Sequence, residues 1–106
     1  MKLLEFDTSD YEDTFLSRSY QFISFLTSVC AENEETIALR VGVKAGVYLK
    51  LTPSFMILPI PDKKGLIGHW CGIPVYKDKT IPADCALDII DQDNNISHTI
   101  YLANMP

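Results

Sequence analysis

The sequence has no long apolar run and no secretory signal. Its longest apolar run, Phe55–Ile60, contains Pro59, whereas a membrane-spanning helix needs about 20 consecutive apolar residues. The N-terminus turns acidic after five residues, and a secretory signal needs an apolar segment of roughly 7–15 residues. We therefore expect a protein that is made and used in a cytoplasm and has no membrane partner.

Histidine and cysteine are too few and too widely spaced to predict a metal site. The two histidines, His69 and His98, and the three cysteines form no Cys-x-x-Cys or His-x-x-x-His pair, and a single His-x-Cys is a weak zinc signal. An odd cysteine count without a secretory signal favours free thiols. We predict no cofactor, no metal and no catalytic residue. The enzyme hypothesis would require His69 or His98 to lie in a cleft beside an acid.

Positive charge is scarce, since 9 Lys and Arg against 14 Asp and Glu give a net charge of -5. This acidity argues against a phosphate-binding surface, so we expect no nucleic-acid partner. The lysines of the middle third leave open a basic, aromatic patch for single-stranded nucleic acid, although lysines are also common at loops and strand edges. Such a patch would contain Lys44, Lys50, Lys63, Lys64, Lys77, Lys79, Tyr48, Trp70 and Tyr76.

The chain does contain enough apolar material for one core, because hydrophobic residues make up 47% of 106 residues. We expect a single domain, residues 1–106. Residues 1–8 indicate a short strand or arm, and Ser9 with Glu12 forms a capping box ahead of a helix over Asp10–Ala31. Its apolar positions follow helical spacing: Phe15, Phe22, Ile23, Leu26, Val29 and Cys30.

Beyond residue 35 the pattern changes to β-type alternation and turn residues. The first two predicted strands form a hairpin, and Phe55–Ile60 is typical of an edge strand because prolines close it. The expected strands are Thr36–Val43, Val47–Leu51, Phe55–Ile60, Trp70–Tyr76 (broken by Gly72 and Pro74), Cys85–Ile90 and Ile96–Leu102. The fold class that these patterns predict is α+β, with one long N-terminal helix packed on a mainly antiparallel β-sheet.

Residues 48–91 show a particular order of strands, glycines and prolines. Gly72 would permit a bulge or close approach, Pro74 would fix φ at a strand entry, and Pro82 would stiffen the return. The order is Tyr48–Leu51, Pro53, a loop at Lys63–Gly68, Gly72-Ile73-Pro74-Val75, a polar turn at Lys77–Thr80, Pro82 and Ala86–Ile90. This segment resembles the axial domain of the major capsid proteins of tailed bacteriophages. The chain is too short for the spine helix, extended loop and peripheral domain of a complete capsid subunit.

The resemblance implies a small phage-type virion structural or assembly protein that acts through protein–protein contacts. Its partners would be itself or other virion proteins, in the cytoplasm of the host cell or in the virion. We place the binding surface on the hairpin that carries Trp70, Tyr76, Lys77 and Lys79, because amphipathic aromatic residues anchor interfaces. The alternative position of Trp70 is the core.

A second hypothesis is an acidic phage-encoded inhibitor or decoy that binds a basic host protein. Such binding would weaken steeply with salt. The acids that would carry it are Asp10, Glu12, Asp13, Glu32, Glu34 and Glu35.

Overall fold

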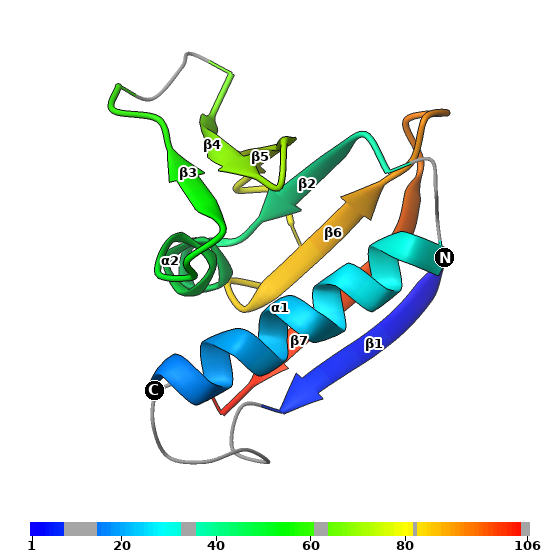
Figure 1. Ribbon diagram of the computed structural model, residues 1–106. Helices are drawn as coiled ribbons and strands as arrows, with labels where there is room; N and C mark the ends of the chain where they lie inside the picture. Colours follow the sequence, from blue (N-terminus) through cyan, green and yellow to red (C-terminus); the bar gives the residue numbers. More distant parts are fainter. Residues whose placement is uncertain (8–14, 33–35, 61–63, 82, 105–106) are drawn as a thin grey trace.

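The computed structural model describes residues 1–7, 15–32, 36–60, 64–81 and 83–104. These residues form an α+β domain in which a seven-stranded mixed sheet is accompanied by two helices (Figure 1). The elements in chain order are β1 (Lys2–Asp7), α1 (Phe15–Glu32), β2 (Ala38–Val41), α2 (Val43–Lys50), β3 (Phe55–Ile57), β4 (Leu66–Trp70), β5 (Ile73–Lys77), β6 (Ala86–Ile90) and β7 (Ile96–Ala103).

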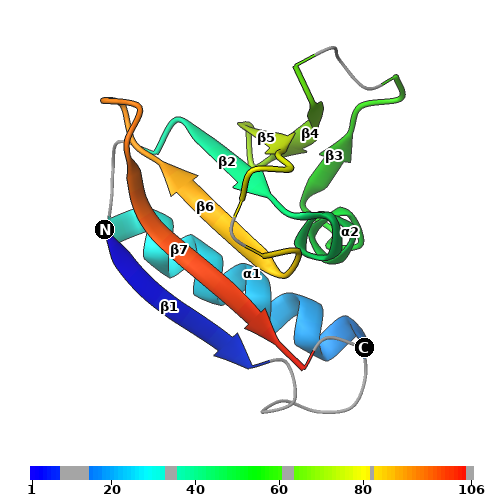
Figure 2. The ribbon, with the colours of Figure 1, turned by 180° about the vertical axis from the view of Figure 1, so that it is seen from behind.

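The strands lie in the order β1-β7-β6-β2-β5-β4-β3, so the first and the last strand of the chain are neighbours (Figure 2). Two pairs are parallel: β1 with β7, in register from Lys2 opposite His98 to Asp7 opposite Ala103, and β2 with β5. The remaining pairs are antiparallel. The expectation of one long helix on a mainly antiparallel sheet is therefore wrong.

A second correction concerns residues 43–51, where helix α2 replaces the expected strand Val47–Leu51 and removes the expected hairpin. The β-branched residues Val43 and Val47 suggested a strand, but both are about half exposed in α2 while Tyr48 and Leu49 are buried. The start of the helix is held by residues far along the chain. The backbone N–H groups of Gly42 and Ala45 donate to the carbonyl oxygens of Ala86 and Asp84, respectively.

Helix α1 lies along one face of the sheet, across β6, β7 and β1, and its apolar stripe closes the core (Figures 1 and 2). Phe22 and Leu26 are fully buried, as their helical spacing predicts. The Phe22 ring meets the rings of Phe6 and Tyr48 edge-on, at centroid distances of 5.3 and 5.4 Å. These contacts join α1 to both β1 and α2 and fix the helix on this face.

The β4–β5 hairpin uses its glycines differently from the expectation. Cys71 and Gly72, with φ of 49° and 80°, form the tight connection between the strands, and a Cβ on Gly72 would meet nothing within 4 Å. The bulge and the close approach expected at Gly72 belong to Gly68 instead. The β4–β5 register shifts there, and the carbonyl oxygen of Met56 on β3 would lie 2.3 Å from a Cβ on Gly68.

Candidate binding pocket on the open face of the sheet

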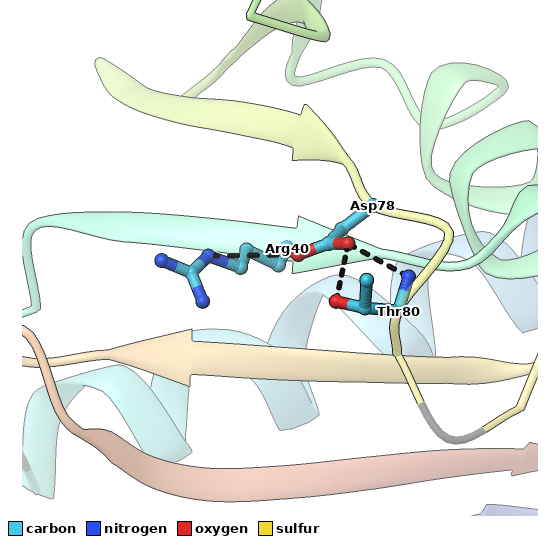
Figure 3. A network of polar contacts seen from close by, with 3 residues as sticks. All are labelled: Arg40, Asp78 and Thr80. Carbon is cyan, nitrogen blue, oxygen red and sulfur yellow. Dashed lines mark hydrogen bonds and ion pairs between the residues drawn. The ribbon is translucent and has the colours of Figure 1, made fainter.

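An open pocket of about 610 Å³ lies on strands β2, β5 and the end of β6. We call the sheet face opposite α1 the open face; Figure 3 shows Arg40 and Asp78 on it, with α1 behind the strands. The residues that line the pocket are Ile37, Ala38, Arg40, Lys64, Pro74, Tyr76, Lys77, Asp78, Lys79, Ile90 and Asn94.

The alternation of the two parallel strands β2 and β5 builds the centre of the pocket. On β2, Leu39 and Val41 are fully buried, so Arg40 between them projects to the other face of the sheet. On β5, Val75 is fully buried and Tyr76 projects to the same side as Arg40. Arg40 and Tyr76 are direct partners in the β2–β5 register, which places their side chains next to each other.

Positive charge is concentrated in this pocket. Four of the nine Lys and Arg residues of the chain line it, together with one carboxylate, that of Asp78. The chain as a whole carries a net charge of -5. The pocket is therefore a local cationic site on an acidic protein, and such a site attracts anionic groups. Its cationic residues are Arg40, Lys64, Lys77 and Lys79.

Asp78 is held in place by the turn that follows β5 (Figure 3). Its Oδ1 accepts hydrogen bonds from the backbone N–H of Thr80 at 2.8 Å and from the Thr80 hydroxyl at 2.7 Å. Its own backbone N–H donates to the carbonyl oxygen of Val41 at 3.0 Å. The hydrogen bonds from Thr80, and to a smaller degree the charge of Arg40, hold the pKa of Asp78 below its ordinary value.

Arg40 approaches Asp78 through the Nε atom of its guanidinium group. Its Nε lies 4.0 Å from Asp78 Oδ2, and the two terminal nitrogens point away from that carboxylate (Figure 3). The side chains of Arg40 and Asp78 are 38% and 27% exposed, so this ion pair adds about 1 kcal/mol or less to stability. Its main effect is on geometry, because it limits where the guanidinium can lie.

Asp88, the register partner of Arg40 on β6, is already engaged. The Thr99 hydroxyl donates to Asp88 Oδ1 at 2.7 Å, and both residues are buried. A buried carboxylate needs such a partner. This bond directs Oδ1 of Asp88 toward Thr99 on β7.

Three of the four predicted binding residues, Tyr76, Lys77 and Lys79, meet in the pocket. The fourth, Trp70, is not available at the surface. It is 2% exposed, and its indole N–H donates to Ser54 Oγ at 3.1 Å. Trp70 thus takes the alternative position, in the core. Sequence reasoning missed Arg40, although the alternation of the predicted strand Thr36–Val43 had already placed Arg40 opposite the apolar face.

The structure also locates residues of the other sites considered from the sequence: the aromatic patch, the histidines and the acidic residues. Trp70 and Tyr48 are buried, so the proposed aromatic patch for single-stranded nucleic acid lacks two of its stacking surfaces. His98 is buried, and its Nδ1 lies 3.0 Å from the Ser97 hydroxyl. Among the described residues, no group of three or more His, Cys, Asp and Glu side chains is placed to hold a metal ion. The capping box and the acids of the decoy hypothesis lie outside the described residues or have undescribed side chains: Ser9, Asp10, Glu12, Asp13, Glu32, Glu34 and Glu35.

A second exposed feature is a group of apolar side chains on or next to α2 and β3, two elements that contact each other at the far edge of the sheet. We call it the α2–β3 surface. None of its side chains lines the pocket. Its members are Val43, Val47 and Leu51, spaced four residues apart and 47–58% exposed, and Met56, Ile57 and Ile60, 63–80% exposed. Met56 and Ile57 are consecutive residues of β3, so their side chains point to opposite faces of the strand.

We compared the chain with protein-family models, curated proteins and solved structures, and none matches it. The resemblance of residues 48–91 to phage capsid axial domains therefore stays a hypothesis. In the part of the chain that the structure describes, neither helix has the length and apolarity required to cross a bilayer.

Proposed function

We propose that this protein is a small structural or assembly protein that works by contacting other proteins. The observation that carries the proposal is the presence of two exposed regions that share no residue: the cationic pocket on the open face and the α2–β3 surface. A chain with two separate surfaces can contact two neighbours at once. This property is what an assembly component requires.

The composition of both surfaces fits protein partners. Arg and Tyr are, together with Trp, enriched among the residues that dominate binding energy in interfaces, and the pocket presents Arg40 and Tyr76 side by side. Large exposed apolar patches are uncommon on monomeric proteins and usually mark interaction sites. The phage context is supported only by the resemblance of residues 48–91.

The occupant that we propose for the α2–β3 surface is a second copy of this chain. Strand β3 is the last strand of the sheet, so among the described residues no strand pairs with its outer side; the Phe55 backbone N–H donates to the carbonyl oxygen of Thr52. Within the three residues Phe55–Ile57 there is no charged residue and no proline, which are two of the devices that prevent edge pairing. A second β3 could pair with it antiparallel around a two-fold axis, with the same surface on both copies.

Light scattering of the purified protein at low and at high salt tests this proposal. We expect a dimer or larger species at both salt concentrations, because apolar contacts are not screened by salt. Ile57→Thr should shift the mass toward the monomer. Leu3→Thr, an exposed apolar position on the opposite edge strand β1, is the matched control and should leave the mass unchanged. A monomer at both salt concentrations would contradict self-assembly.

A further inference from the structure

We infer that the cationic pocket binds an acidic peptide segment of a partner protein, with a carboxylate on Arg40 and a neighbouring apolar side chain against Ile37 and Pro74. The inference rests on the proposed function, since it names the chemistry of a protein partner. It concerns only the pocket and is independent of what occupies the α2–β3 surface.

The geometry of Arg40 selects a carboxylate. Asp78 lies near Nε alone, so the edge of the guanidinium formed by the terminal nitrogens faces away from Asp78 (Figure 3). A planar guanidinium donates two parallel hydrogen bonds to a carboxylate through such an edge. Thr80 fixes Asp78, and Asp78 in turn restricts Arg40, so the donor fork is partly oriented before any ligand arrives.

The distribution of charge selects a short anionic segment over a long polyanion. Outside the pocket the chain has 13 of its 14 acidic residues but only five of its nine cationic ones. A long nucleic-acid backbone would therefore be repelled by the net negative charge of the rest of the chain. A peptide with one or two carboxylates between neutral residues avoids that repulsion.

The apolar part of the pocket selects a peptide over a free small anion. Ile37 is 46% exposed at the pocket, where Pro74 and Tyr76 also contribute apolar surface. An apolar side chain of the peptide that covered Ile37 would remove apolar surface from water and so strengthen binding. Inorganic phosphate or acetate cannot use this surface.

Fluorescence anisotropy with a labelled synthetic peptide in which Glu and Leu alternate tests the inference. We expect saturable binding that weakens with salt. A peptide with Gln in place of Glu should bind at least about tenfold more weakly, because it loses charge-assisted hydrogen bonds. A peptide with Ser in place of Leu should also bind more weakly. The inference would be overturned if the Gln peptide bound equally well. It would also be overturned if inorganic phosphate or single-stranded DNA displaced the Glu–Leu peptide at a lower concentration than unlabelled peptide does.

Charge variants with a matched control separate the pocket from general electrostatics. Lys77→Glu with Lys79→Glu should weaken binding about tenfold or more, whereas Lys44→Glu with Lys50→Glu makes the same charge change on exposed positions of α2 and should change it about twofold or less. Equal loss in both double variants would overturn the inference.

Arg40→Lys keeps the charge and removes the planar fork, so it should still weaken binding about tenfold. Unchanged binding would overturn the role of Arg40, and the circular dichroism spectrum checks that the variant is folded. The outcomes also separate the two proposals. A stable oligomer without peptide binding refutes this inference alone, whereas a monomer that binds the peptide refutes self-assembly alone.

Discussion

Replacing Gly68 by alanine should displace strand β3 and destabilise the domain. A Cβ at this position would lie 2.3 Å from the carbonyl oxygen of Met56 and 2.6 Å from the Phe55 ring. Real Cβ atoms do not approach other atoms so closely, so something must move. Because the nearest atom belongs to the backbone of the paired strand, rotation of a side chain cannot relieve the clash, and β3 must move away from β4.

The expected cost follows from the size of this clash. An extra methyl group in a tightly packed site costs about 1–3 kcal/mol, and the contact with backbone places Gly68→Ala in the upper half of that range, at about 2–3 kcal/mol. For a domain of this size, each kcal/mol lowers the melting temperature by about 4–8 °C, so we expect a decrease of about 10–20 °C. Thermal and urea unfolding followed by circular dichroism measure both quantities.

Gly72→Ala on the same hairpin is the matched control. Its Cβ would meet nothing within 4 Å, but its φ of +80° is unfavourable for alanine. The left-handed conformation costs an L-residue about 1–2 kcal/mol, so Gly72→Ala should be the milder change. If it destabilised the protein as much as Gly68→Ala, or if Gly68→Ala were neutral, the argument from close approach at Gly68 would be refuted.

Three further predictions concern the core, the turn after β5 and the thiols. Leu26→Ala, at a fully buried position of α1, should lower the free energy of unfolding by about 2–5 kcal/mol in urea titrations. Thr80→Ala should raise the pKa of Asp78 toward its ordinary value, which NMR of the carboxyl carbon can follow. In the wild type, the lowered pKa stabilises the folded protein at pH values above the ordinary carboxyl pKa. This stability is lost as the pH falls through the lowered pKa. Iodoacetamide should alkylate the exposed Cys71 faster than Cys30, because burial raises the pKa of the Cys30 thiol; equal rates would contradict this difference.

Sequence patterns within a single segment predicted several of the helices and strands. The alternation in residues 96–102 gave β7, the run at Cys85–Ile90 gave β6, and helical spacing gave the buried face of α1. Helix α2 could not be predicted in this way. Its valines favour a strand, and its start is fixed by carbonyl groups of residues 84 and 86, which lie some forty positions further along the chain.

The parallel strand pairs β1–β7 and β2–β5 could not be predicted from the sequence either, because strands that pair across a long stretch of sequence leave no local pattern. This also limited the prediction of the site. Tyr76, Lys77 and Lys79 are close in sequence and could be grouped, but Arg40 joins them only because β2 pairs with β5. Trp70 misled for the opposite reason: an aromatic residue next to a turn fits both an interface and the core, and only its contacts decide.

The parallel pairing of β1 with β7 also determines how the domain bears mechanical load. A force applied between Lys2 and Ala103 pulls the two edge-side strands past each other along their length. Six register pairs, from Lys2–His98 to Asp7–Ala103, then resist in shear together, whereas a hairpin pulled at its open end separates one pair at a time. A domain that is paired in this way resists stretching when it is held at these two points.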